Sequence, residues 1–308
     1  MKNSKILLLI AITAIGSAAI FTACQKSAAD TSSSGGISTQ DAAALQTSAA
    51  TDDESDNVYN DVLSNVLGVN DDAGIGAGVG VFLAAPASTG TPVSQFGEGA
   101  DSAGRCFTVT VSPDRAGAFP KTITIDFGTG CTGRDGHVRR GKIITVYTGH
   151  MIESGSTATT TFDGFYFDSV KVEGTVVAKN KTTGNALAFS ITVTNGKLTA
   201  PSGDYIEVNR SHTWAQTSGM DTPHTPADDI FSITGNSSGT AQVAGVTAQW
   251  ITNITQPVVR KLLCRWRVAG VVTVTHNDKS AVLDYGNGDC DNTATVTIGS
   301  KTYNITLR

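Results

Sequence analysis

Four of the five cysteines in this 308-residue chain form two pairs whose matched spacing suits disulfide bonds. Cys106 and Cys131 lie 25 residues apart, and Cys264 and Cys290 lie 26 apart. A turn-rich segment lies near the middle of each pair, so the two cysteines of a pair fall opposite each other in a β-hairpin. We therefore predict the disulfides Cys106–Cys131 and Cys264–Cys290, each stabilising the fold by roughly 3 kcal/mol in the chain-entropy model. Pairing between the two hairpins is the alternative.

The fifth cysteine, Cys24, follows a segment with the features of an export signal. Residues 1–23 combine two lysines, a continuous apolar stretch and small residues at the end, which is the pattern of a secretory signal peptide. A cysteine directly after such a segment resembles the lipobox of bacterial lipoproteins, which implies cleavage before Cys24 and diacylglycerol on its sulfur. We expect acyl chains on Cys24 to hold the mature protein on a membrane. A plain secreted protein and an uncleaved anchor are the alternatives.

Acidic residues near the second cysteine of each pair are candidates for a turn or a calcium site. Asp126 and Asp284 each begin a glycine-rich turn before the cysteine, where a carboxylate commonly accepts backbone N–H bonds. Asp284, Asp289 and Asp291 also place several oxygens close together, which Ca²⁺ prefers, but they lack the order of an EF-hand loop. We therefore expect Asp126 and Asp284 to structure turns, with the second cluster only a weak calcium candidate.

The remaining clusters of reactive residue types favour structural roles. The segment 235–239 reads G-x-S-x-G, but β-type sequence on both sides predicts a hairpin turn and not a nucleophile elbow. The densest ligand-capable region is more simply a polar loop than a metal site; its members are His212, Asp221, His224, Asp228 and Asp229. The glutamates are scattered, and Trp214, Trp250 and Trp266 are expected to fill cores. No catalytic residue, metal or cofactor is predicted.

Composition excludes several classes of protein. Charged residues make up only 16% of the chain, and 22 basic against 27 acidic residues give a formal net charge of −5. A nucleic-acid binder needs a clustered basic surface, so no nucleic-acid partner is expected. The hydrophobic fraction of 40% is ample for a folded core.

The chain divides into four segments by composition. After the signal peptide, residues 24–56 are rich in Ser, Ala, Thr and Asp, which predicts a disordered tether behind the lipidated cysteine. Residues 57–102 hold apolar residues at helical spacing over 58–67, which predicts a short amphipathic helix, and then a glycine-rich segment. Residues 103–308 form a β body.

The β body consists of β-branched and aromatic runs, many with period-two alternation, separated by Gly, Asn, Asp and Pro clusters. We predict an all-β fold, mainly an antiparallel meander of about a dozen strands. So many strands curl, form a sandwich of two layers, or close into a barrel-like shape.

The two cysteine pairs mark an internal repeat. Each pair encloses two strands around a turn, at 113–120 and at 276–280. A third strand is expected after each pair, entered through Gly141-Lys142 and through Gly299-Ser300-Lys301. Lys142 and Lys301 both lie 11 residues past their cysteine.

The sequence around these motifs resembles a family of uncharacterised Bacteroidetes-type lipoproteins. The resemblance covers about residues 100–308 and rests on IDFGTGC at 125–131, CRWRVAG at 264–270 and LDYGNGDC at 283–290. It implies β structure and a place in the cell envelope, as an outer-membrane lipoprotein on the periplasmic face or the cell surface. It implies no chemistry.

We therefore expect a lipid-anchored envelope protein whose role is structural or is to bind a protein or a glycan. The alternative is a glycan-active hydrolase with carboxylates from separate strands, which leaves the question of enzyme activity open. A hydrolase needs a cleft that holds two carboxyl groups roughly 5–10 Å apart. A binding module instead needs an exposed surface suited to its ligand.

Overall fold

The computed structural model describes residues 37–72, 106–115, 117–133, 136–222 and 226–307. One long helix, α1 (Thr39–Asp72), comes before the strands. The strands are β1 (Thr108–Ser112), β2 (Lys121–Asp126), β3 (Cys131–Thr132), β4 (Val138–Tyr147), β5 (Thr157–Phe167), β6 (Val170–Asn180), β7 (Ala188–Thr199), β8 (Tyr205–Ser218), β9 (Ile230–Val243), β10 (Val246–Lys261), β11 (Ala269–His276), β12 (Lys279–Asn287), β13 (Thr293–Ile298) and β14 (Lys301–Thr306). A 3₁₀ turn, η1 (Pro226–Asp228), lies before β9.

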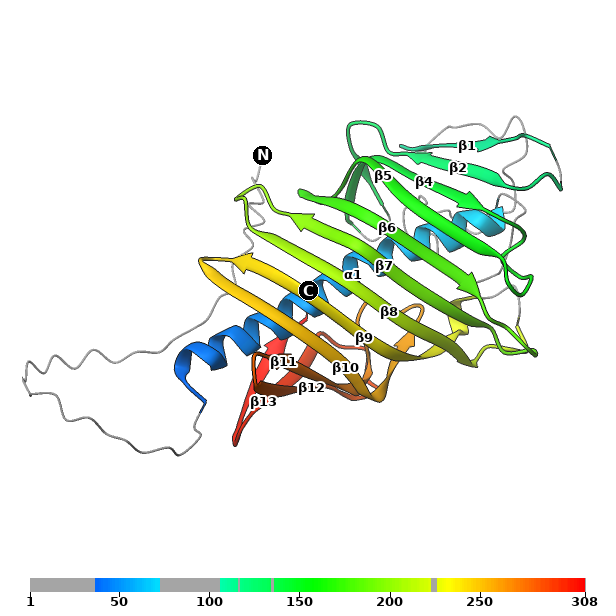
Figure 1. The fold of residues 1–308 in the computed structure, drawn as a ribbon. Coiled ribbons are helices and arrows are strands. Elements are labelled where there is room, and N and C mark those ends of the chain that lie inside the picture. Colours follow the sequence, from blue (N-terminus) through cyan, green and yellow to red (C-terminus); the bar gives the residue numbers. More distant parts are fainter. Residues whose placement is uncertain (1–36, 73–105, 116, 134–135, 223–225, 308) are drawn as a thin grey trace, which may run out of the picture.

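The 14 strands form one antiparallel meander. Their order is β1-β2-β4 and then β5 to β14 in sequence, while β3 pairs with β4 off this path. Along this order each strand pairs with the next one antiparallel, as in a series of β-hairpins. The sheet curls strongly, and β1 and β14 end the order without pairing with each other (Figure 1). The predicted all-β antiparallel meander is confirmed, and of the three predicted shapes the curled sheet is the one observed.

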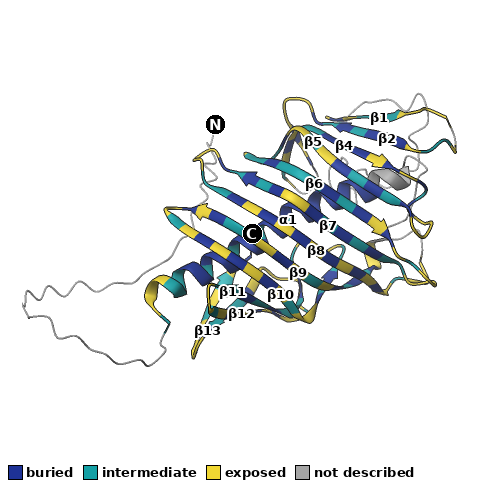
Figure 2. Ribbon diagram, viewed as in Figure 1, coloured by how far each residue is buried: buried dark blue, intermediate teal, exposed yellow. Residues whose placement is uncertain are grey.

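Alternation along the strands separates two faces of the sheet. β8 shows it most clearly, because buried and exposed residues alternate from Ile206 to Gln216. Figure 2 shows the same alternating stripes across the central strands. The buried residues point to the concave side, where they pack around α1, and the exposed ones form the convex side.

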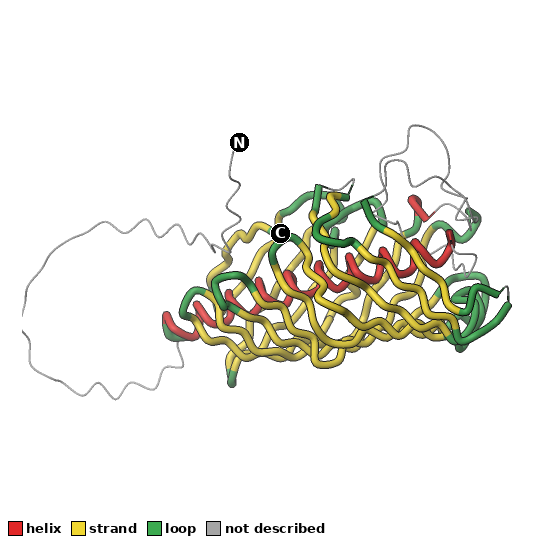
Figure 3. The backbone as a smooth tube through the Cα atoms, turned by 90° about the horizontal axis from the view of Figure 1, so that it is seen from above, coloured by secondary structure: helices red, strands yellow, loops and turns green. Residues whose placement is uncertain are grey.

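The curled sheet surrounds α1 along most of its length (Figure 3). Between Ala44 and Leu67 every side chain of the helix is buried, except Gln46, Ala50, Glu54 and Asn57, which are partly buried. Apolar residues of its second half, such as Val62 and Val66, join the common hydrophobic core. The core therefore lies between the concave face of the sheet and the enclosed helix, whereas in a β-sandwich it lies between two sheets.

The predicted disordered tether is wrong for residues 39–56, because these residues form the first half of α1. The prediction rested on their lack of large apolar residues, but their polar side chains find partners on the sheet. The predicted short helix over 58–67 is part of the same longer helix. Residues 24–36 and the glycine-rich segment 74–80 lie outside the described residues.

Ser38 caps the start of the helix. The backbone N–H of Asp41 donates to Ser38 Oγ at 3.0 Å, and Ser38 Oγ donates to the Asp41 carboxylate at 2.7 Å. The first of these bonds satisfies one of the backbone N–H groups that the first turn of a helix leaves without an intrahelical partner. The pattern Ser-x-x-Asp was visible in the sequence at 38–41 and was the signal for the missed helix start.

The helix crosses the concave face diagonally. At its start, Ile37 lies beside the β13–β14 turn, where a Cβ at Gly299 would be 3.7 Å from Ile37 Cδ1. Farther along, Tyr59 donates its hydroxyl to the carbonyl of Glu173 on β6 at 2.7 Å. Near its end, the hydroxyl of Tyr147 on β4 donates to a carbonyl of the helix at 2.9 Å. α1 therefore contacts strands from both halves of the meander.

Both predicted disulfides are present. Cys106–Cys131 and Cys264–Cys290 have Cα separations of 5.1 and 5.8 Å. The predicted turns between them are also confirmed, because β1 pairs with β2 and β11 pairs with β12 across them. Since strand direction alternates along the meander, the first disulfide lies at one end of the sheet and the second at the opposite end.

The repeat does not extend to the predicted third strand. Gly141 and Lys142 lie inside β4, at a bulge opposite β5, and do not begin a strand. Gly299 and Ser300 form the turn before β14, which is the second strand after its cysteine pair. The equal spacing of Lys142 and Lys301 is therefore not a structural equivalence.

Candidate functional site

The interior of the curled sheet holds a cluster of charged side chains, which we call the interior charge cluster. Four carboxylates of α1 face four arginines of the β body, and each of these residues is at most 6% exposed. The members are Asp52, Asp53, Asp56, Asp61, Arg139, Arg210, Arg260 and Arg267. Charged groups are almost never buried this deeply unless they are paired.

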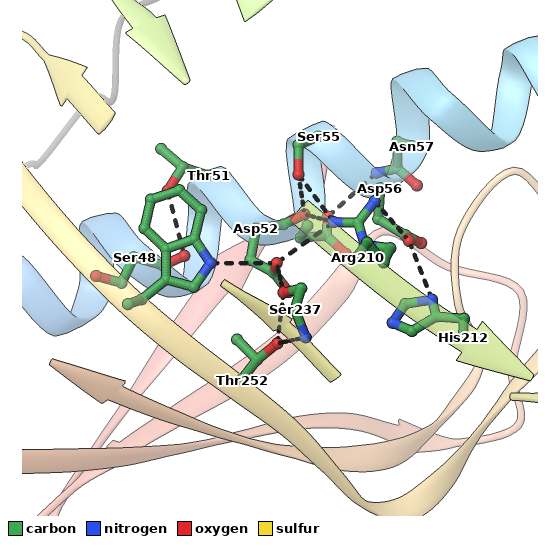
Figure 4. A network of polar contacts seen from close by, with 12 residues as sticks. Ser48, Thr51, Asp52, Ser55, Asp56, Asn57, Arg210, His212, Ser237 and Thr252 are labelled. Carbon is green, nitrogen blue, oxygen red and sulfur yellow. Dashed lines mark hydrogen bonds and ion pairs between the residues drawn. The ribbon is translucent and has the colours of Figure 1, made fainter. Parts of the chain in front are cut away.

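Asp56 is the centre of this cluster (Figure 4). Its carboxylate lies 3.0 Å from Nη1 of Arg210 on β8, contacts Arg267, and lies 3.7 Å from Nδ1 of His212. Asp53, one turn away, lies 3.5 Å from Arg267 and accepts the hydroxyl of Tyr285 on β12 at 3.1 Å. These contacts join the helix to β8, β12 and the segment between β10 and β11.

Asp52 joins the helix to two further strands. Its Oδ1 accepts hydrogen bonds from Trp250 Nε1 at 3.3 Å and from the hydroxyl of Ser237, and it lies 3.3 Å from Nη2 of Arg210. Ser237 also shares a 2.6 Å hydrogen bond with Thr252. The second half of the helix is held in the same way, because Arg139 Nε donates to Asp61 at 3.0 Å.

Burial and pairing shift the ionisation of these groups in different directions. Burial raises the pKa of Asp53 to about 6, although the charge of Arg267 acts in the opposite direction. For Asp56, burial also raises the pKa, but the charges of Arg267 and Arg210 outweigh it and leave the pKa well below its usual range. Burial lowers the pKa of His212 to about 4. His212 is therefore neutral at pH 7, while Asp56 is ionised.

The interior charge cluster suits a structural role better than catalysis. Its carboxylates are engaged with arginines, hydroxyls or an indole N–H, and they lie out of contact with solvent. Removing one partner of a buried pair leaves an uncompensated charge, which costs about 3–5 kcal/mol. The cluster therefore fixes the position of α1 inside the sheet.

Asp126 and Asp284 have the predicted turn-structuring role. Asp126 Oδ1 accepts the N–H of Gly128 at 2.8 Å, and Asp284 Oδ1 accepts that of Gly286 at 2.9 Å. Asp291 likewise accepts the N–H of Thr293 at 2.8 Å. Within the described ranges no three His, Cys, Asp or Glu residues, including Asp284, Asp289 and Asp291, are grouped so that they could hold a metal ion.

The histidine-containing region is not a single cluster. His212 lies on the concave side of β8 beside Asp56, far along the strand from the polar connection that leads to β9. In that connection Thr222 donates to Asp228 at 2.7 Å, and Gln216 donates to buried Asp229 at 2.7 Å. His224 lies outside the described residues.

The G-x-S-x-G segment is not the predicted hairpin turn, because residues 235–239 lie in the middle of β9. Ser237 points inward to Asp52 and has no histidine beside it in the described contacts.

Trp214 and Trp250 are 5% and 1% exposed, which confirms their predicted core positions. Trp266 is partly buried and packs against the core.

The convex face carries a groove of about 580 Å³ across β8 to β11, which we call the outer groove. Polar residues dominate its lining. The lining residues are Glu207, Asn209, Ser238, Gly239, Thr240, Gln249, Trp250, Ile251, Thr275 and Asn277. No motif indicates the groove, because its side chains come from four strands and from the β11–β12 turn.

Two residues shape the floor of the outer groove. A Cβ at Gly239 would lie 2.4 Å from the Trp250 ring and 2.5 Å from the carbonyl of Glu207, so only glycine fits here. Trp250 lines the groove and also donates to Asp52 inside the sheet. Glu207 is the one carboxylate in the lining, and it lies 2.7 Å from Lys197 Nζ on β7. Ile251 is 56% exposed and supplies an apolar surface.

The predicted lipidation site, Cys24, and the signal peptide lie outside the described residues. In the part of the chain that the structure describes, no helix combines the length and apolar character needed to cross a bilayer.

Comparison with known proteins gives no relative: no family model, no curated protein and no solved structure matches this chain.

Proposed function

We propose that this protein is a lipid-anchored lipoprotein of the outer envelope that binds a glycan chain in the outer groove. The observation that carries this proposal is the lining of the groove, where amides, hydroxyls and one carboxylate from four strands surround about 580 Å³. Sugars offer many hydroxyls that such groups bind, and exposed Ile251 supplies an apolar contact for a sugar face. The resemblance to envelope lipoproteins and the predicted anchor at Cys24 support the location.

A binding module fits the groove better than a hydrolase. Hydrolysis of a glycosidic bond uses two carboxyl groups that flank the bond. Glu207 is the one carboxylate among the lining residues, and it lies 2.7 Å from Lys197 Nζ. It cannot supply both the acid and the base.

The groove is tested by binding the detergent-solubilised full chain to an array of neutral and acidic oligosaccharides, followed by calorimetry on the strongest ligand. Asn209→Ala and Gln249→Ala each remove a groove amide, so each should weaken binding about fivefold. Gln256→Ala removes an exposed amide on the same strand as Gln249 but outside the groove, so it should leave the dissociation constant unchanged. An equal effect of all three variants, or no glycan bound at all, would contradict the proposal.

The anchor is tested separately with Cys24→Ala. Loss of the acyl chains should move the protein from the membrane to the soluble fraction, and it should stop the incorporation of a clickable palmitate analogue. A variant that stays in the membrane fraction would refute lipid anchoring without affecting the groove.

A further inference from the structure

Arg260 on β10 differs from the other arginines of the interior charge cluster. Arg139, Arg210 and Arg267 each lie within 3.5 Å of at least one aspartate of α1. Arg260 is only 5% exposed, yet among the described residues no carboxylate lies within ion-pair distance of it. Its Nε and Nη1 are buried and have no hydrogen-bond partner there.

The surroundings of Arg260 add a second buried donor. Its guanidinium carbon lies 5.8 Å from the centre of the Trp214 ring on β8. Trp214 Nε1 is also buried and has no acceptor among the described residues. Phe231 lies opposite Arg260 on β9, and its aromatic side chain offers no acceptor to these donors. Three buried donor nitrogens on two neighbouring side chains therefore lack an acceptor among the described residues.

Burying these donors without hydrogen-bond acceptors costs free energy of folding. A guanidinium stays charged in proteins even where, as here, burial lowers the pKa of Arg260. Removing such a charge from water carries a penalty that an acceptor must offset. Nearly all buried donors in native proteins have an acceptor. We therefore expect an acceptor beside Arg260 and Trp214 that is not one of the described residues.

We propose that Arg260 holds a small monovalent anion, of the size of chloride, inside the curled sheet, with Trp214 Nε1 as an additional donor. Arg260 has no carboxylate within ion-pair distance among the described residues, so a single negative charge would complete its pairing. Three donor nitrogens beside two aromatic rings suit a small anion, whereas a phosphate dianion carries four oxygens and needs more donors.

Charge balance links this anion to a proton. With all four aspartates ionised, the four arginines of the cluster are already balanced, so an added anion is accompanied by protonation of one carboxylate. Asp53 is the best candidate, because its pKa is raised to about 6. The groups that face it are Asp52 and Asp56 on α1, Arg267 before β11 and Tyr285 on β12. Anion binding should therefore be tighter at pH 5 than at pH 8.

The test uses the detergent-solubilised full chain at fixed ionic strength, with sodium chloride exchanged stepwise for sodium gluconate, whose anion is too large for the site. Chloride should raise Tm by about 5 °C, and more at pH 5 than at pH 8. Chloride-35 NMR should show line broadening that bromide competes away. Equal Tm values in both salts, or stronger stabilisation by phosphate than by chloride, would overturn the proposal.

Variants assign the effect to Arg260. Arg260→Met should abolish the chloride response, and Trp214→Phe should reduce it while keeping an aromatic ring in place. Arg140→Met is the matched control, because Arg140 is exposed and stacks on Tyr166 outside the cluster. A full chloride response in Arg260→Met would also overturn the proposal. If Arg260→Met does not fold, Trp214→Phe and the NMR titration of the unaltered protein decide the question.

Discussion

Two ion pairs of similar length on strand β8 lie in opposite environments. On the concave side, Arg210 lies 3.0 Å from Asp56, and both side chains are 2% exposed. On the convex side, Glu207 lies 2.7 Å from Lys197, and these side chains are 50% and 40% exposed. Distance alone would rank the outer pair as the stronger. Solvent screening reverses the ranking, because exposed pairs contribute about 0–1 kcal/mol while breaking a buried pair costs several times more.

The comparison explains how such a polar helix can be enclosed. The interior pairs do not make α1 more stable than an apolar helix of the same shape would be, because desolvation offsets much of their attraction. They do give one position of the helix a much lower free energy than any shifted position. A shift of one turn would leave several buried charges without partners, so the cluster sets the register of α1 against the sheet.

The largest effect is expected from Asp56→Ala. This change removes the common partner of Arg210, Arg267 and His212 and should lower the free energy of unfolding by about 3–5 kcal/mol. Denaturant titration measures it. Asp278→Ala, in the exposed β11–β12 turn, is the control and should change stability by less than about 0.5 kcal/mol. A loss below about 1 kcal/mol for Asp56→Ala would mean that the interior pairs behave like surface pairs.

The disulfides brace the sheet independently of α1. Replacing Cys106 and Cys131 together by serine, or Cys264 and Cys290 together, should lower the free energy of unfolding by roughly 3 kcal/mol in each case. The loops closed are nearly equal, with separations of 25 and 26 residues, so the two losses should be similar. Unfolding of each double variant with and without Asp56→Ala tests independence. Losses that fail to add would show that the sheet ends and the helix are coupled.

Local patterns in the sequence predicted the β body but not what fills it. Alternating strands, turn residues and paired cysteines are local signals, so the meander, both disulfides and the turn roles of Asp126 and Asp284 were predictable. The polar segment 39–56 was predicted to be disordered because its own composition buries little apolar surface. Its partners, such as Arg210 and Arg267, lie more than 150 residues away, and no local pattern records them. The outer groove was missed for the same reason.

Two interior groups should give opposite pH dependences that nearly cancel. The folded-state pKa of Asp53 is raised from 3.8 to about 6, so its contribution to stability is greatest at low pH and is lost as pH rises through this window. The folded-state pKa of His212 is lowered from 6.5 to about 4, so its contribution is present above 6.5 and is lost as pH falls. The contributions of Asp53 and His212 should therefore nearly cancel between pH 4 and 6.5, while Asp229, whose pKa burial also raises to about 6, adds a loss of stability as pH rises.

Single variants should unmask each contribution. Relative to the unaltered protein, Asp53→Asn should shift the slope of the free energy of unfolding against pH upward, and His212→Gln should shift it downward, each by on the order of 1–3 kcal/mol across this window. Urea titrations at half-unit pH steps measure both slopes. Parallel profiles for the two variants would show that Asp53 and His212 do not titrate in opposite directions.

The smallest effect on stability is expected from Glu207→Gln, which removes the charge of the outer pair. Because both partners are exposed, the free energy of unfolding should change by less than about 1 kcal/mol, and the change should shrink further at high salt. The same variant keeps an acceptor and adds a donor in the outer groove, so glycan binding should persist with altered selectivity. Calorimetry and denaturant titration on one sample separate the two effects. A stability loss as large as that of Asp56→Ala would mean that position in the sheet does not determine the strength of an ion pair, and the contrast between the two faces of β8 would fail.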